Sequence, residues 1–326
     1  MPIKKFMNIA YIRGLFAVCC FFCFLPYQAA QTVEDTANAD DQYFSRSVIS
    51  VNSNLVSVPV SATDASGRGV SDLRIEDFRI TEDGRPAEIS RLVDSSQSSL
   101  NITLLFDLSG SVNPNFEFEQ RAAIDFLKKI WKEGDAVTII PFDEKAEALL
   151  KRGDNLQEAM WTLRQLQPTS KTTSFFDAVT LAARLMDQTT AEENRQAIIV
   201  ISDGADNTSA VTLASALAEL QRRDAVFYAI NPSGASVRLN RINIKGQENL
   251  EELSKATGGT VFVSDDTGDL ENIFNKIAAE LRAQYLLYYY SLSRRMDGKF
   301  HKIEVSIPER PELNIRARPG FLAVPR

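Results

Sequence analysis

The chain has 326 residues, of which 44% are hydrophobic and 24% charged, values typical of a soluble globular protein that exclude a wholly disordered chain. At about 100–200 residues per domain, this length predicts one large domain with a smaller companion. The formal net charge of −7 argues against nucleic acid and anionic lipid surfaces as partners. All three cysteines lie within the first 30 residues, so the rest of the chain has no disulfide, thiolate metal site or thiol nucleophile.

Residues 1–30 have the pattern of a signal peptide. Their only charges are Lys4, Lys5 and Arg13, which are followed by the apolar run Gly14–Leu25 and by small residues at 29 and 30. A run of about 12 residues suits a signal peptide and is shorter than the ~20 residues that span a bilayer. We therefore expect a secreted or cell-envelope protein, either periplasmic or extracellular. The alternative is an uncleaved N-terminal anchor that tethers the protein to a membrane.

The segments at either end of the remaining chain predict β structure. Residues 31–45 are polar and acidic and indicate a flexible linker. Residues 46–97 are rich in strand patterns, and Asp83-Gly84 is a strong signal for a tight hairpin turn. Residues 285–326 contain three further strand patterns, at 285–290, 302–307 and 313–317. Neither half is large enough to bury a core alone, so we expect the two to form one small β-sandwich.

Residues 98–284 alternate apolar runs with longer amphipathic patterns. The apolar runs are Ile102–Phe106, Ala136–Phe142, Ala197–Ile201, Ala225–Ile230 and Thr260–Val263. The helix patterns are Phe116–Lys132, Leu156–Leu166, Phe175–Gln188, Thr212–Arg223, Glu248–Thr257 and Asp269–Ala283. Continuous apolar runs fit strands buried on both faces. The alternation predicts a doubly wound, mostly parallel α/β sheet of Rossmann-like type, inserted between the two β halves.

Asp107, Ser109 and Ser111 follow the first apolar run, where a doubly wound sheet binds its ligands. Their alternate spacing can turn one carboxylate and two hydroxyls toward a common point. Such hard oxygen ligands suit Mg²⁺, with Mn²⁺ or Ca²⁺ as alternatives, rather than Zn²⁺. On its own the pattern is weak, because a carboxylate with nearby serines often only caps a helix.

Two other loops reach the same edge of the predicted sheet. Asp203 follows the run Ala197–Ile201, and residues 169–174 form a loop of mostly hydroxyl side chains before the helix at 175. Asp177, at the start of that helix, is expected to orient its loop, and Asp206 to be a solvated loop charge.

The order and spacing of these residues resemble a von Willebrand factor type A domain with its metal-ion-dependent adhesion site. The resemblance implies five ligands, Asp107, Ser109, Ser111, Thr173 and Asp203. It also implies an open coordination position that takes an Asp or Glu side chain of a protein partner.

One departure and one extension qualify this resemblance. The family usually has Gly-Gly before the threonine, whereas Lys171 and Thr172 stand here, so Thr172 rivals Thr173 as the ligand. Lys171 would also bring a positive charge near the site. The segments Asp72–Gly84 and Gln284–Phe321 are similar to those of a bacterial subfamily of exported proteins related to this domain.

Three functions remain open on the sequence. The first is a non-enzymatic, metal-dependent binding module. The second is an Mg²⁺-dependent hydrolase or phosphatase with Asp107 as nucleophile, which is disfavoured because Ser109 stands where phosphatases have a second aspartate. The third is a structural protein with a vestigial metal site, an alternative that rests on Lys171.

Overall fold

The computed structural model describes residues 55–94, 98–110, 116–186, 194–234, 241–264, 269–292 and 297–323. All of these belong to one compact unit, Val51–Arg326. The expected signal peptide, the expected linker and Ser111 lie outside the described residues. In the described ranges, no helix combines the length and the apolar character needed to cross a membrane.

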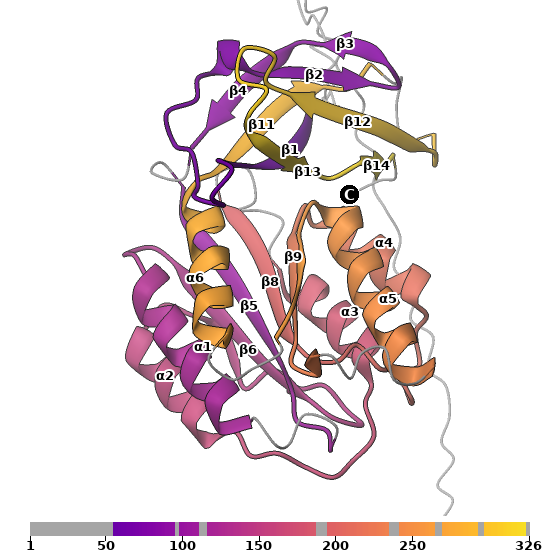
Figure 1. Ribbon diagram of the computed structural model, residues 1–326. Coiled ribbons are helices and arrows are strands. Elements are labelled where there is room, and N and C mark those ends of the chain that lie inside the picture. The colour runs from indigo at the N-terminus through magenta and orange to yellow at the C-terminus, as the bar shows by residue number, and fades with distance from the viewer. Residues whose placement is uncertain are drawn as a thin grey trace, which may run out of the picture. The chain divides into compact units, whose positions relative to one another are not determined.

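A six-stranded sheet forms the centre of the α/β region (Figure 1), with the strand order β10-β9-β8-β5-β6-β7. Its strands are β5 (Leu100–Asp107), β6 (Ala136–Phe142), β7 (Leu150–Gly153), β8 (Arg195–Ile201), β9 (Val226–Asn231) and β10 (Val261–Val263). All neighbouring pairs are parallel except β6 and β7. Every residue of β6, β8 and β9 is buried, which explains why their sequences are continuous apolar runs rather than alternating ones.

Helices cover both faces of this sheet. One face packs against α1 (Phe116–Ile130), α2 (Leu156–Gln165) and α6 (Asp269–Arg282). The other packs against α3 (Phe175–Leu185), α4 (Leu213–Arg222) and α5 (Arg241–Thr257).

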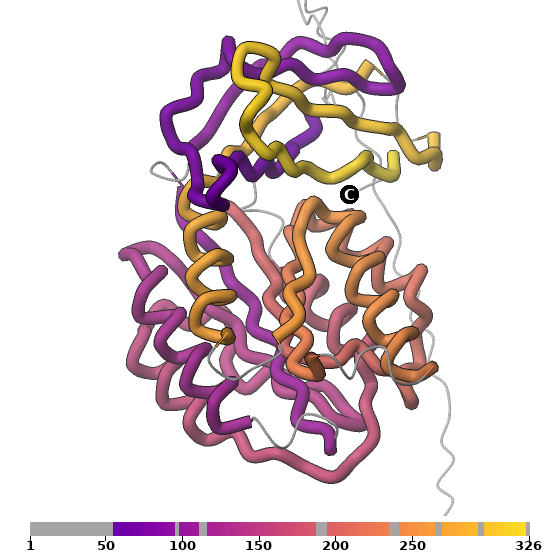
Figure 2. Tube along the Cα trace, viewed as in Figure 1, coloured from indigo at the N-terminus to yellow at the C-terminus, as the bar shows by residue number. Residues whose placement is uncertain are grey.

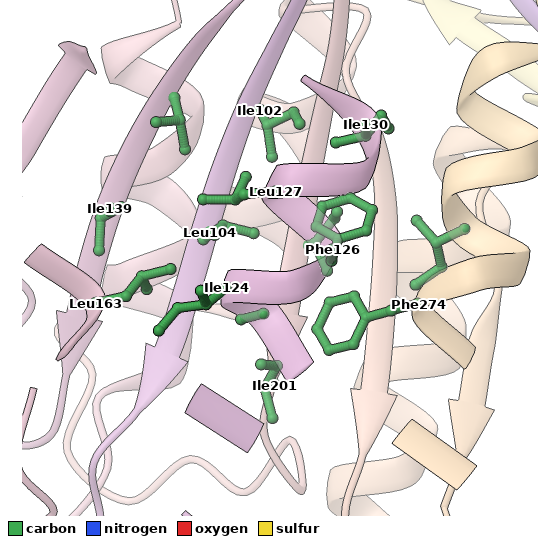
Figure 3. Close-up of a cluster of buried hydrophobic side chains, with 14 of the residues drawn as sticks. Ile102, Leu104, Ile124, Phe126, Leu127, Ile130, Ile139, Leu163, Ile201 and Phe274 are labelled. Carbon is green, nitrogen blue, oxygen red and sulfur yellow. The ribbon is translucent and has the colours of Figure 1, made fainter. Parts of the chain in front are cut away.

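The first of these cores shows how α1 is held. Figure 3 shows Ile124 and Leu127 of α1 against Leu104 of β5, with Phe126 facing Phe274 of α6. The two phenylalanine rings have centroids 5.0 Å apart. Burying an aliphatic or aromatic side chain of this size contributes about 1.5–3 kcal/mol, so this stripe fixes α1 on the sheet. The position of α1 matters because the helix follows directly on the loop after β5.

Two four-stranded antiparallel sheets make up the rest of the unit. The first has the order β13 (Asn314–Ala317), β1 (Leu55–Thr63), β11 (Gln284–Tyr290), β4 (Ile89–Val93). The second has the order β14 (Gly320–Leu322), β12 (Phe300–Ser306), β2 (Arg79–Glu82), β3 (Arg85–Ala87), and a 3₁₀ turn at Ile75–Asp77 precedes β2.

The two sheets share one core, to which Val58, Tyr285, Phe78 and Ile303 contribute. Each sheet mixes strands from both ends of the described chain, as the indigo and yellow tubes of Figure 2 show. The fold class expected from the sequence is therefore confirmed. The domain boundaries at 46, 98 and 285 stay a prediction, because the contacts group residues 51–326 together.

Individual elements differ from the expectation. Strand β7 was not anticipated, because Leu150–Gly153 has two exposed residues in the middle and no apolar run. Helix α5 begins at Arg241 rather than at 248, since its first turns are mostly polar and give no helical apolar pattern. These differences lie at the periphery and leave the loops after β5 and β8 where the sequence places them.

Candidate metal centre

Two carboxylates meet at the carboxyl edge of the parallel sheet. Asp107 ends β5 and Asp203 follows β8, and the two strands pair in parallel up to Phe106 and Ile201. Asp107 is completely buried and Asp203 is 5% exposed. The Ser202 hydroxyl donates to Asp107 Oδ2 at 2.6 Å, which ties the loop after β8 to the end of β5.

Ser109 lies beside Asp107, and its backbone N–H donates to Asp107 Oδ1 at 2.9 Å. The loop holding residues 169–174 is hydrogen-bonded to both others. The Thr169 N–H donates to the Leu108 carbonyl at 2.6 Å, and the Thr173 carbonyl accepts from Asn207 N at 2.9 Å. The three loops therefore converge, as the sequence predicted.

The convergence brings together four of the five predicted ligands. Asp107, Ser109, Thr173 and Asp203 all belong to these loops and all are buried, whereas Ser111 lies outside the described residues. Thr172, the rival of Thr173, is exposed. Joint coordination of one ion by the five residues stays a prediction.

The charge state of Asp107 reflects this crowding. Burial raises the pKa of Asp107 to about 6, and the nearby charge of Asp203 adds to the rise, while hydrogen bonds from Ser109 and Ser202 oppose it. Placing two carboxylates together in a buried site is unfavourable without a cation. A divalent ion would relieve both the desolvation and the repulsion, so the donor set fits such an ion.

A third buried carboxylate, Glu119 of α1, was missed by the sequence analysis. It is fully buried, and no described residue forms a hydrogen bond with either of its carboxylate oxygens. Burial, with a contribution from the charge of Asp107, raises its pKa to about 8. The signal was present in the sequence, because Glu119 occupies the apolar stripe that Phe116, Ala123 and Leu127 define on α1.

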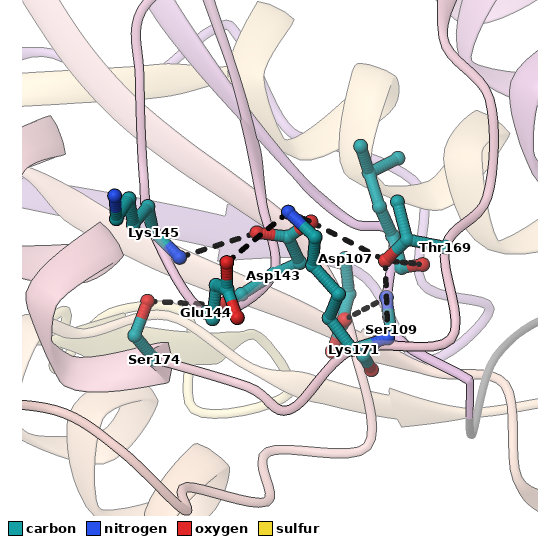
Figure 4. A network of polar contacts seen from close by, with 9 residues as sticks. Asp107, Ser109, Asp143, Glu144, Lys145, Thr169, Lys171 and Ser174 are labelled. Carbon is teal, nitrogen blue, oxygen red and sulfur yellow. Dashed lines mark hydrogen bonds and ion pairs between the residues drawn. The ribbon is translucent and has the colours of Figure 1, made fainter.

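The positive charge of Lys171 is paired with two acidic residues, which the sequence did not indicate. Its ammonium group lies 3.2 Å from Asp143 Oδ2 and 3.3 Å from Glu144 Oε1, in the loop after β6 (Figure 4). These two acids raise the pKa of Lys171 and balance its charge. Asp143 also accepts a hydrogen bond from the Thr169 hydroxyl at 3.3 Å. This bond and the ion pair with Lys171 hold the loop of residues 169–174 against the loop after β6.

Two further acidic residues at this edge, Asp177 and Asp206, accept hydrogen bonds from backbone N–H groups. Asp177 accepts from the N–H groups of Ala210 and Val211 at 3.0–3.1 Å, in agreement with the loop-orienting role expected for it. Asp206 was expected to be solvated, but it is partly buried and accepts from Phe176 N at 3.3 Å at the start of α3. Its carboxylate is therefore engaged in capping.

The matched family agrees with this geometry. Residues 92–205 match the von Willebrand factor type A domain. This chain contains a von Willebrand factor type A domain. The matched stretch spans β5, α1, β6, the loop at 169–174, α3 and β8, and it includes every predicted ligand. The type A domain thus places its predicted ligands after β5, before α3 and after β8.

Solved structures similar to this chain include a conserved hypothetical protein, BatB, from Bacteroides thetaiotaomicron, with 19% identity over 55% of this chain and 98% of that one and a TM-score of 0.44. An aerotolerance-related membrane protein from Bacteroides fragilis is 19% identical over 56% of this chain and 98% of that one, with a TM-score of 0.44. Proximal thread matrix protein 1 of the mussel byssus, in a structure with a zinc-occupied MIDAS motif, is 19% identical. The match covers 60% of this chain and 48% of that one, with a TM-score of 0.48. No curated protein matches the sequence significantly.

Proposed function

We propose that the type A domain binds one divalent cation, Mg²⁺ in the first instance, through Asp107, Ser109, Ser111, Thr173 and Asp203. The ion keeps one open coordination position, which takes an exposed Asp or Glu side chain of a protein partner. The observation that carries the proposal is the juxtaposition of Asp107 and Asp203, two buried carboxylates on neighbouring strand ends. All the donors are oxygens, which suits Mg²⁺, Mn²⁺ or Ca²⁺.

Burial supports Thr173 rather than Thr172 as the fourth of these ligands. Thr173 is 3% exposed and its carbonyl is bonded to the loop that follows Asp203, whereas Thr172 points into solvent. A ligand held by its own backbone bonds loses little conformational freedom when the ion binds, so the buried threonine is the better-prepared donor.

Binding rather than catalysis is the function that this donor set supports. A hydrolase with Asp107 as nucleophile would need a general acid or base, and the position two residues on is Ser109. The single histidine of the chain, His301, belongs to β12 in the antiparallel region. The charge of the ion supplies the attraction for a carboxylate, and the surrounding loops supply specificity.

The proposed setting is outside the cytoplasm. We assign residues 1–30 as an export signal, either cleaved or retained as a membrane tether, on the basis of its charged start and apolar run. Partners would then be proteins of the cell envelope or the exterior.

Thermal unfolding with and without metal tests the cation site. We expect Mg²⁺ at one hundred times its Kd to stabilise the wild type by about 2.7 kcal/mol relative to a chelator. Asp107→Ala should abolish this difference. Asp206→Asn, which removes a carboxylate of the same edge that caps α3, should keep it. Identical wild-type curves in Mg²⁺ and chelator would defeat the proposal and favour a structural protein with a vestigial site.

Partner binding needs a separate measurement. The mature chain, immobilised in Mg²⁺, should retain a partner that a chelator releases, and replacing one acidic residue of that partner by its amide should weaken binding. A partner that stays bound in chelator and also binds the Asp107→Ala variant would use another surface.

A further inference from the structure

The antiparallel region holds two titratable side chains on the face of a sheet that packs into its core. In β2, Ile80 and Glu82 are the buried residues, and in β12 His301 and Ile303 are. The register pairs Glu82 with Ile303, so alternation along each strand brings Glu82 and His301 to the same face. Glu82 is 2% exposed and His301 is 6% exposed. Ionisable groups in such positions are unfavourable unless they are paired or bind an ion.

Asp83 joins them through the tight turn between β2 and β3. Asp83 and Gly84 have φ values of 50° and 76°, the left-handed conformation of a hairpin turn. The Lys302 N–H donates to Asp83 Oδ1 at 2.9 Å, while Asp83 Oδ2 lies 2.8 Å from His301 Nδ1. Glu82 Oε1 lies 3.9 Å from the same nitrogen. One ligand atom from each of the three residues therefore falls within 4.8 Å of the others.

We propose that Glu82, Asp83 and His301 bind a second divalent cation, a first-row transition-metal ion such as Zn²⁺. Its ligands are His301 Nδ1 and one oxygen from each carboxylate, a set that suits zinc better than Mg²⁺. Metal–ligand bonds of about 2.0–2.2 Å place tetrahedral or octahedral neighbours about 2.8–3.6 Å apart. Of the two distances from Nδ1, 2.8 Å lies at the lower end of this interval and 3.9 Å lies just above it, so a small rotation of the Glu82 side chain completes the site.

The groups around the cluster already hold these ligands in place. His301 Nε2 lies 3.2 Å from Asp297 Oδ1, the arrangement in which a carboxylate orients a metal-binding imidazole. Without an ion both ring nitrogens donate to carboxylates, Nδ1 to Asp83 and Nε2 to Asp297, and the bound ion would replace the proton on Nδ1 while Nε2 keeps its hydrogen bond. The imidazole stacks on Phe321, with ring centroids 5.4 Å apart, and Ser291 Oγ donates to Glu82 Oε1 at 2.8 Å.

A buried tyrosine hydroxyl also lies beside the cluster. Tyr289 of β11 is completely buried, and its hydroxyl lies within hydrogen-bonding reach of the Glu82 carboxylate. Burial raises the pKa of Tyr289, and so do its hydrogen bond with Glu82 and the negative charge of that carboxylate.

The charge balance favours a cation. Glu82, Asp83 and Asp297 outnumber the one histidine, and two arginines of the described residues that act on this region offer it little charge. Arg318 pairs with Asp224, and Arg85 acts on Asp83 only as the weakest of the influences that lower the pKa of that carboxyl. A bound ion would tie the β2–β3 turn to β12, independently of the Asp107 site, with which it shares no residue.

The single histidine makes the test direct. The full chain, produced without a histidine tag and with ¹⁵N-labelled imidazole, gives signals from His301 alone. We expect Zn²⁺ to shift the Nδ1 signal, to saturate at one equivalent, and to do so equally in Asp107→Asn. Signals that ignore Zn²⁺ and move only with pH would overturn the proposal, because His301 would then be a protonated member of an ion-pair network.

Calorimetry on variants gives a second readout. The wild type should bind one more equivalent of Zn²⁺ than His301→Gln or Asp83→Asn, and Zn²⁺ should raise the melting temperature of the wild type but not that of these variants. Asp107→Asn is the matched control and should keep this equivalent. Equal stoichiometry in wild type and His301→Gln would refute the site, and if His301→Gln fails to fold, the spectrum of the unaltered chain decides.

Discussion

Replacing Glu119 by glutamine should stabilise the protein at neutral pH and should do nothing at pH 4. The pKa of Glu119 is about 8 in the folded chain against an ordinary value of 4.5. At pH 7 the unfolded chain carries the ionised side chain, whereas the folded chain must hold its proton, and this costs about 3 kcal/mol at 1.36 kcal/mol per pH unit. Glutamine has the same size and no charge, so the variant avoids that cost.

The sign of the pH dependence follows from the same values. Between about pH 4.5 and 8 the folded state binds more protons than the unfolded state, so the stability of the wild type falls as pH rises. The advantage of Glu119→Gln should therefore grow from near zero at pH 4 to about 3 kcal/mol at pH 7 and about 5 kcal/mol above pH 8.

Urea unfolding at pH 4, 7 and 9, in chelator, measures this difference. Glu117→Gln is the control, because Glu117 is exposed in the same first turn of α1 and its change should stay within about 0.5 kcal/mol at every pH. An advantage for Glu119→Gln that is constant with pH, or a loss at pH 7, would refute the reasoning.

Three further predictions concern the metal edge of the parallel sheet and the ion pair of Arg318 with Asp224. Asp107 must lose its proton to bind an ion and its pKa is about 6, so Mg²⁺ affinity, measured by calorimetry, should fall about tenfold per pH unit below pH 6. Gly204→Ala should lower the free energy of unfolding by about 2–3 kcal/mol, because φ is +75° and a Cβ would lie 2.3 Å from the Gly246 carbonyl oxygen. Asp224→Ala should cost about 3–5 kcal/mol in urea unfolding, since it leaves the buried guanidinium of Arg318 without its charge partner.

Matched variants separate these causes. Gly67 has φ of +78° but open space around it, so Gly67→Ala isolates backbone strain and should cost less than Gly204→Ala. The exposed pair of Asp125 and Lys128 in α1 should contribute at most about 1 kcal/mol, so Asp125→Ala sets the scale for Asp224→Ala. An Mg²⁺ affinity that is flat from pH 5 to 7, or equal losses within either pair of variants, would contradict the corresponding argument.

The sequence predicts the parallel sheet well because a strand that is buried on both faces has apolar residues at consecutive positions. In strand β8, Ala197–Ile201 is an uninterrupted apolar run, and its end fixes the position of Asp203. The pairing of Lys171 with Asp143 and Glu144 could not be read in this way, since no local pattern relates a loop after β6 to one before α3.

The cluster at His301 shows the same limit in another form. Glu82, Asp83 and His301 are brought together by the register of β2 on β12, two strands separated by the whole α/β region. The sequence predicts the turn at Asp83-Gly84 and a strand near His301, but not that the two are neighbours. Glu119 is different, because helical spacing alone places it among apolar residues.

Strand β1 lies between β11 and β13, with Val60 paired to Tyr285 on one side and to Ala317 on the other. Both partners follow the whole α/β region in the sequence, so neither edge of β1 can be paired before β11 and β13 have been synthesised. Such edges invite aggregation. A chain that stops before β11 would therefore expose the unpaired edges of this apolar strand to chaperones and proteases. Completion of the antiparallel sheet is the step that covers these edges.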